Sequence, residues 1–126
     1  PEIIREISKV FTDFNLSILI QTFALTLLEH RDKFHNHEKN VVKSRNKLFN
    51  RLSAIENVAV YSSDTNFLIF TIGEKTLELH DYLSAHDISA RSMHKLPLLA
   101  NHLRVSVGTE GDNDLFVKLI EEFLNK

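Results

Sequence analysis

Apolar residues at helical spacing dominate the N-terminal quarter of the chain. From Leu16 to Leu28 they recur every three or four positions, and further apolar residues fall on the remaining faces of the same helix. Such a helix is typically buried on nearly all sides. We therefore predict a buried helix here, with Asp13 and Asn15 as its capping residues, and a short helix over 1–8 before it.

The middle of the chain changes from a helical to a strand-like pattern. Spacing predicts a second long helix from Phe34 to Ile55, with an apolar stripe opposite a basic face. Two β-branched and aromatic runs follow, at 58–63 and 66–72, and turn-forming residues join them. The second run lacks polar alternation before Thr71, which predicts a central strand covered on both faces. The apolar stripe of the long helix consists of Val41, Leu48, Leu52 and Ile55.

Helices and short strands alternate in the rest of the chain. The predicted elements are a helix over 74–87, a short strand over 88–93, a loop containing Pro97, a strand over 102–108, a turn over 108–114 and a closing helix over 115–124. We expect their buried residues to be Leu79, Tyr82 and Leu83 in the first helix and Leu115, Phe116, Leu119, Ile120 and Phe123 in the closing one. The order of elements indicates an α+β domain, with one small sheet packed against helices.

Length and charge restrict the possible partners. With 126 residues the chain fits a single domain. Its net charge of −2 and isoelectric point of about 6.4 predict neither a nucleic-acid nor a membrane partner. Seven basic residues between Arg31 and Arg51 fit the solvated face of the long helix. The absence of cysteine excludes disulfides and thiol catalysis and is compatible with a cytoplasmic protein.

Three local patterns resemble catalytic or metal-binding motifs without completing them. Ser44 to Lys47 fits S-x-x-K but lacks the partner motifs that such a nucleophile needs. His35 and His37 lack the spacing of a helical zinc pair. The sequence at 73–76 lacks the upstream glycine of a phosphate loop. We therefore predict no catalytic, metal-binding or cofactor-binding residue in this chain.

The strand "LRVSVG" carries one arginine in an otherwise apolar or small-residue pattern. Alternation places Leu103, Val105 and Val107 on one face and Arg104, Ser106 and Gly108 on the other. That pattern alone favours a solvated arginine. However, small neighbours leave the guanidinium uncrowded, and its planar set of donors suits a carboxylate or a phosphate. Because Arg91 lies on the preceding strand, the two arginines are also compatible with an anion clamp.

Four segments together resemble a known family: "DFNLSILIQTFALTLLE", "SSDTNFLIF", "ISARSM" and "LRVSVGTEGDNDLFVKLI". They follow the order found in the C-terminal part of pyridoxal-phosphate-dependent class I and II aminotransferases, and are most similar to the histidinol-phosphate aminotransferase family. The resemblance implies that residues 1–126 are the small C-terminal domain of the aspartate-aminotransferase-like fold, with a mainly antiparallel sheet packed against helices. Because the chain starts at Pro1 and its only methionine is Met93, we expect a piece of a longer polypeptide.

The resemblance also implies roles for three residues. Arg104 matches the arginine that binds the carboxylate of the amino donor, and Arg91 matches a second anion-binding arginine. Asn66 matches, more weakly, an asparagine near the substrate. The implied reaction transfers an amino group between histidinol phosphate and 2-oxoglutarate, in an enzyme expected to be a homodimer. Pyridoxal phosphate and its lysine would belong to a large domain upstream, so the isolated chain is expected to be inactive.

Departures from the family pattern leave other interpretations open. Asp87 stands where related sequences often have glycine, and Gly111 and Asp112 replace a usual pair of acidic residues. A threonine-phosphate decarboxylase or another class I or II aminotransferase is therefore an alternative. A third interpretation is a stand-alone α+β domain that binds an anion for regulation, and a fourth is a structural domain with Arg104 in water. We also expect the two N-terminal helices to face the large domain, and thus to expose an apolar patch in its absence.

Overall fold

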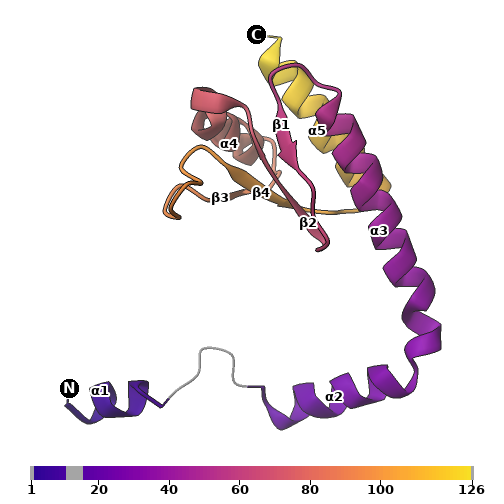
Figure 1. The fold of residues 1–126 in the computed structure, drawn as a ribbon, viewed down its shortest axis with the longest axis vertical. Helices are drawn as coiled ribbons and strands as arrows, with labels where there is room; N and C mark the ends of the chain where they lie inside the picture. The colour runs from indigo at the N-terminus through magenta and orange to yellow at the C-terminus, as the bar shows by residue number, and fades with distance from the viewer. Residues whose placement is uncertain (1, 11–15, 126) are drawn as a thin grey trace. The chain divides into compact units, whose positions relative to one another are not determined.

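The elements follow the predicted order (Figure 1). The computed structural model describes residues 2–10 and 16–125, apart from the side chain of Phe34. The elements are α1 (Glu2–Ser8), α2 (Ile18–Glu29), α3 (Arg31–Ser53), β1 (Ala59–Tyr61), β2 (Phe67–Thr71), the 3-10 turn η1 (Gly73–Lys75), α4 (Thr76–Ala85), β3 (Arg91–Ser92), β4 (Leu103–Ser106) and α5 (Glu110–Leu124). They divide into two compact units, 1–36 and 37–126.

The unit 37–126 is built around one small antiparallel sheet. Its strands lie in the order β1-β2-β4-β3, and every neighbouring pair is antiparallel. Strand β2 therefore has a strand on each side, as predicted for the run at 66–72. The sheet and its helices confirm the α+β fold class.

One face of the sheet forms the core with helices. Strands β2 and β4 contribute fully or nearly fully buried side chains, and α4 and α5 lie together behind them (Figure 1). The aromatic rings of Phe70 and Phe116 meet edge to face, with centroids 5.7 Å apart. Helix α3 also contributes to this core. The buried hydrophobic residues of the core are Leu48, Leu52, Leu68, Phe70, Leu79, Leu83, Ala90, Leu103, Val105, Phe116, Val117, Leu119 and Ile120.

The other face of the sheet is open, which corrects one prediction. Leu68 and Phe70 of β2 are buried, whereas Phe67, Ile69 and Thr71 are only half-buried. The prediction that this strand is covered on both faces is therefore wrong for this chain. Its apolar run reflects a helix-covered face and a second, partly apolar face, which periodicity alone does not separate.

Helix burial differs from the predictions at a few positions. In α5, Val117 is buried and Leu115 is 44% exposed, so the core-facing stripe is shifted from the predicted one. In α3, Leu48 and Leu52 are buried as expected. The two ends of the predicted stripe, Val41 and Ile55, are half-buried.

The unit 1–36 has an apolar exterior. Helix α2 begins at Ile18, and the Ser17 hydroxyl oxygen caps it by accepting a hydrogen bond from the Ile20 N–H at 3.4 Å. The predicted caps Asp13 and Asn15 lie outside the described residues. Neither α1 nor α2 contains a buried residue, so α2 is not buried within the described chain, and both helices expose the apolar side chains expected of them in the absence of a large domain. The apolar side chains at least half exposed here are Ile3, Ile4, Val10, Leu16, Ile18, Leu19, Ile20, Phe23, Leu25 and Leu28.

We expect this apolar surface to make the 126-residue chain self-associate at high concentration, because large contiguous apolar patches rarely stay exposed to water. Sedimentation velocity measures the effect. Replacing Leu19, which is 79% exposed, by glutamate should reduce the association. The matched control is Leu98→Glu, at an apolar residue that is 96% exposed in the unit 37–126. A monomer at all concentrations, or an equal response of both variants, would contradict this expectation.

Candidate functional site

The two candidate arginines are direct partners in the sheet. Strand β3 pairs antiparallel with β4, and the register places Arg91 opposite Arg104. Side chains of directly opposite residues project from the same face, with Cβ atoms about 4.5–5.5 Å apart. Because Leu103 and Val105 point into the core, alternation sends the Arg104 side chain to the open face. The structure thus brings together the two arginines that the sequence singled out.

The charge on this part of the open face is unbalanced. Arg104 is half-buried and Arg91 is exposed, and neither forms an ion pair with any other residue that the structure describes. Like charges directly opposite each other destabilise a pair of strands. An anion between the two guanidinium groups would offset that repulsion and accept hydrogen bonds from their N–H groups. The pair is therefore suited to binding a carboxylate or a phosphate.

Asn66 directly precedes β2 and lies away from the arginine row. Its carbonyl accepts a hydrogen bond from the Val107 N–H at 2.9 Å, just beyond the end of β4. In β2 the partner of Arg104 is Ile69, three positions further along than Asn66. Asn66 is exposed, and its main-chain contact places it where β4 leaves the sheet.

The turn after β4 is tied firmly to α5. Asn113 is 8% exposed, and its side-chain amide bonds to both main-chain groups of Gly108. Its Oδ1 accepts from the Gly108 N–H, and its Nδ2 donates to the Gly108 carbonyl, each at 3.1 Å. A Cβ at Gly108 would lie 2.9 Å from the Cβ of Asp112, so only glycine fits without displacement. These contacts fix the C-terminal end of the strand that carries Arg104.

Helix α5 starts earlier than predicted because of a capping box. Thr109 is the N-cap, and its Oγ1 accepts from the Asp112 N–H at 3.3 Å. In return, Asp112 Oδ2 accepts from the N–H and the hydroxyl of Thr109, at 3.0 and 2.7 Å. The helix therefore begins at Glu110 and includes most of the segment predicted as a turn. The Thr-x-x-Asp pattern is the sequence signal for this start.

These bonds give Asp112 a predictable pH dependence. The hydroxyl of Thr109, followed by its main-chain N–H, lowers the pKa of Asp112 from its ordinary value of 3.8. A carboxyl with a lowered folded pKa stabilises the fold fully above 3.8, and this stability is lost as pH falls through the folded value. We therefore expect Asp112→Asn to lower the free energy of unfolding at neutral pH, and the difference to shrink in acid.

Urea unfolding across the acid range measures this effect. Asp64→Asn, at an exposed turn position, is the control for losing a carboxylate. A difference between wild type and Asp112→Asn that stays constant down to the lowest pH would contradict the prediction.

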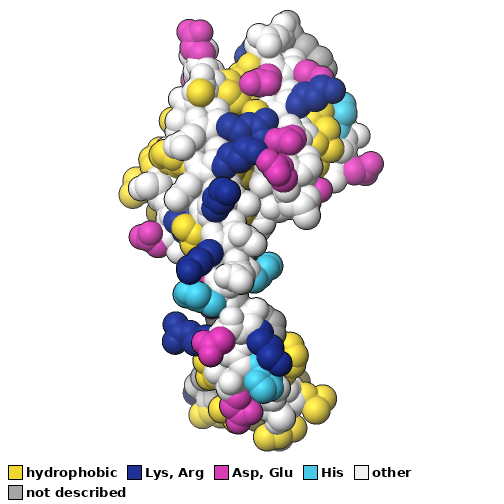
Figure 2. Space-filling view, turned by 90° about the vertical axis from the view of Figure 1, so that its right-hand side faces the viewer, with side chains coloured by type: hydrophobic (Ala, Val, Ile, Leu, Met, Phe, Trp, Pro, Cys, Tyr) yellow, Lys and Arg dark blue, Asp and Glu magenta, His cyan; other side chains and the backbone are white. Residues whose placement is uncertain are grey.

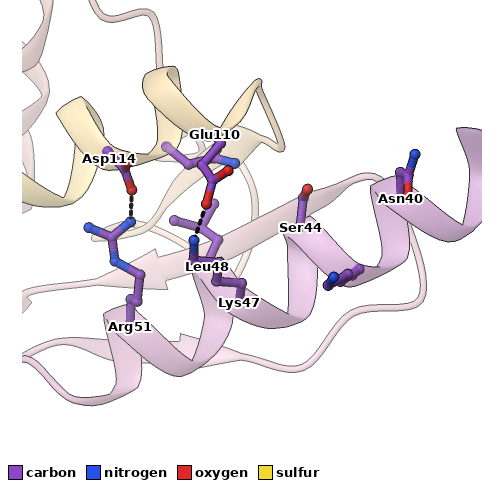
Figure 3. Close-up of a pocket in the computed structure, with 9 residues that line it drawn as sticks. Asn40, Ser44, Lys47, Leu48, Arg51, Glu110 and Asp114 are labelled. Atoms are coloured by element: carbon purple, nitrogen blue, oxygen red, sulfur yellow. Dashed lines mark hydrogen bonds and ion pairs between the residues drawn. The ribbon is translucent and has the colours of Figure 1, made fainter.

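A separate groove lies between α3 and α5 on the helical side of the unit (Figure 3). Its volume is about 310 Å³, and two ion pairs cross it, Lys47 with Glu110 and Arg51 with Asp114. Figure 2 shows Lys and Arg side chains following α3 with acidic groups beside them. The S-x-x-K lysine, Lys47, thus bonds to Glu110, and the basic face of α3 contributes to joining α3 and α5.

A comparison with known proteins settles the family. The model of the family described as aminotransferase class I and II matches residues 1–120. The chain belongs to this family. The resemblance found in the four segments is therefore confirmed.

Several class I and II aminotransferases are similar to nearly all of this chain. It is 34% identical over 122 residues to a histidinol-phosphate aminotransferase of Hydrogenobaculum, covering 96% of this chain and 35% of that protein. It is 35% identical over 123 residues to one of Polaromonas naphthalenivorans, covering 97% and 33%. The chain thus spans about a third of the length of these relatives.

The fold is also shared with a solved structure. The L-threonine-O-3-phosphate decarboxylase from Porphyromonas gingivalis superposes with a TM-score of 0.74 at 21% identity. The match covers 99% of this chain and 39% of the decarboxylase chain. At this identity the likeness shows the fold alone.

The described lysines of this aminotransferase chain do not lie in desolvated pockets. Every described lysine is exposed on the surface, whereas the lysine that holds this cofactor needs a desolvated pocket with further polar contacts. The described residues contain no group of three or more His, Asp or Glu side chains that could hold a metal ion. None of the described helices is both long and apolar enough to cross a membrane.

Proposed function

We propose that this chain is the small, substrate-anion-binding domain of a histidinol-phosphate aminotransferase. The whole enzyme would transfer the amino group of histidinol phosphate to 2-oxoglutarate, giving imidazole acetol phosphate and glutamate. The observation that carries the proposal is the direct pairing of Arg91 and Arg104 on an open sheet face without an acidic partner among the described residues. The curated relatives of this name, at 34% and 35% identity, support the choice of substrate.

The two arginines would serve both halves of the reaction. Glutamate presents a carboxylate, which one guanidinium binds through two parallel hydrogen bonds. Histidinol phosphate has no carboxylate next to its amine, but its phosphate carries more charge and three acceptor oxygens, and so can occupy both arginines. One clamp would therefore accept either substrate in turn. Asn66, which precedes β2 and contacts Val107 just beyond β4, has a weaker claim to a place near the substrate.

The cofactor would be held outside these residues. Pyridoxal phosphate supplies the electron sink in reactions of this class. Because the chain spans about a third of its relatives, we propose that the remaining part of the polypeptide binds the cofactor and supplies the catalytic lysine. The residues of this chain bind and orient the substrate anion. We propose further that the whole enzyme is a cytoplasmic homodimer.

Activity of the full-length polypeptide with a panel of amines tests this proposal. We expect histidinol phosphate and 2-oxoglutarate to yield glutamate, and histidinol without its phosphate to react far less well, because it leaves the arginines without an anion. Release of carbon dioxide from threonine phosphate would instead assign a decarboxylase. Phosphate binding without turnover of any amine would favour a regulatory domain. If the polypeptide neither binds phosphate nor turns over any amine, the anion site itself is wrong.

A further inference from the structure

Phe67 touches the guanidinium of Arg104 from the neighbouring strand. The register of β2 and β4 pairs Phe67 with Ser106 and Ile69 with Arg104, so Phe67 and Arg104 are diagonal neighbours on the open face. The Cζ atom of Arg104 lies 4.9 Å from the centroid of the Phe67 ring. This distance is within the range of about 6 Å over which an aromatic face attracts a cation.

This contact occupies the arginine without using its donors. The attraction acts on the positive charge of the guanidinium as a whole, so the N–H groups that point away from the ring stay available for an anion. The ring also keeps water from the side that it covers, which lowers the local dielectric and strengthens charge-assisted hydrogen bonds. An arginine held in this way loses less side-chain freedom when an anion binds.

The main chain that carries the Phe67 ring is well held. The Phe67 N–H donates to the Thr65 hydroxyl at 3.3 Å, and that hydroxyl lies 2.8 Å from the hydroxyl of Ser63. The next residue, Leu68, is fully buried in the core. The main chain at Phe67 is therefore held on both sides. Because the phenylalanine side chain has fewer rotatable bonds than arginine, the long arginine side chain adjusts to the ring.

The two arginines of the clamp differ in this respect. Arg91 is exposed, and within the described residues no aromatic ring is in cation–π contact with it. Arg104 is half-buried and lies against Phe67. The clamp thus has one arginine oriented in advance and one that is free to adjust.

We propose that Phe67 is a positioning residue that orients Arg104 for the substrate anion. This inference rests on the proposed function of the arginine pair. In this proposal Phe67 does not contact the substrate and acts through the guanidinium of Arg104. The effect of Phe67 should appear as tighter binding of the substrate carboxylate or phosphate.

The test compares variants of Phe67 in the full-length enzyme. Phe67→Leu keeps an apolar side chain and removes the aromatic face, and we expect it to raise the KM for glutamate and the inhibition constant of inorganic phosphate about three- to tenfold. We expect kcat to change less than twofold. Phe67→Tyr retains the ring and should restore both constants. Phe67→Met is a second ring-free variant, in case the leucine variant fails to fold.

Two controls separate orientation from general packing. Ile69→Leu changes an apolar residue on the same strand and face, opposite Arg104, and should leave both constants unchanged. In an Arg104→Ala background, Phe67→Leu should have no further effect, because the group that it orients is gone. Equal effects of Phe67→Leu in both backgrounds, or an equal effect of Ile69→Leu, would overturn the inference.

Failure of this inference about Phe67 can be distinguished from failure of the proposed function. If Arg104→Ala leaves the KM for glutamate unchanged, the anion site itself is wrong. If Arg104→Ala raises this KM and Phe67→Leu does not, the site stands and only the role of Phe67 is rejected.

Discussion

Replacing Arg104 by alanine in the full-length enzyme is expected to lower kcat/KM for the amino donor roughly thirtyfold to several thousandfold. This factor corresponds to an activation barrier about 2–5 kcal/mol higher. The removed group would make charge-assisted hydrogen bonds to the substrate, and the arginine opposite it, Arg91, would remain alone. The KM for glutamate should rise strongly. Steady-state kinetics with both substrates measures the effect.

Two further variants define the cause of this loss. Arg104→Lys keeps the charge but loses the planar pair of donors, so it should recover only part of the activity. Arg51→Ala removes an arginine that pairs with Asp114 across the α3–α5 groove, and should leave the kinetics unchanged. Unchanged kinetics in Arg104→Ala would reject the assignment of the anion site.

Replacing Phe70 by alanine is expected to lower the free energy of unfolding by about 3–5 kcal/mol. Phe70 is fully buried, pairs in the sheet with Leu103, and meets Phe116 edge to face. Removing the ring takes apolar surface out of the core and leaves a cavity that neighbouring strands and helices fill only in part. The loss is large compared with the total stability of an ordinary domain, about 5–15 kcal/mol.

Denaturant unfolding followed by circular dichroism measures this change. The control is Leu115→Ala in α5, at a leucine that is 44% exposed, where we expect a change of about half a kcal/mol or less. Equal losses in the two variants would contradict the burial pattern of the core.

The pairing of the two arginines was accessible from sequence because strand residues alternate between faces. Alternation places the Arg104 side chain on the face away from the buried Leu103 and Val105. The preceding short strand carries Arg91 close enough to act on the same anion. The contact of Arg104 with Phe67 was not accessible in the same way. It depends on the register between β2 and β4, which are more than thirty residues apart in the chain, and one strand's periodicity does not fix its partner's register.

Burial was harder to predict where apolar residues cover a whole element. In α2 the pattern predicted burial on nearly all sides, yet residues such as Leu19 and Phe23 are exposed in this chain. An apolar pattern indicates that a surface avoids water, and it does not say which polypeptide covers it. In α5 the difference is smaller. Leu115 and Val117 are both apolar and flank the buried Phe116, so spacing alone does not say on which side of Phe116 the core-facing stripe extends.

The double hydrogen bond between Asn113 and Gly108 has a consequence for motion. It joins the end of β4 to the first turn of α5, while β4 is itself paired with β2 and β3. Bending of β4 alone would break these bonds, so the Arg104 main chain is held to the sheet and to α5 together. On the proposed function, we therefore expect Arg104 to approach or leave a substrate anion in step with the sheet and α5.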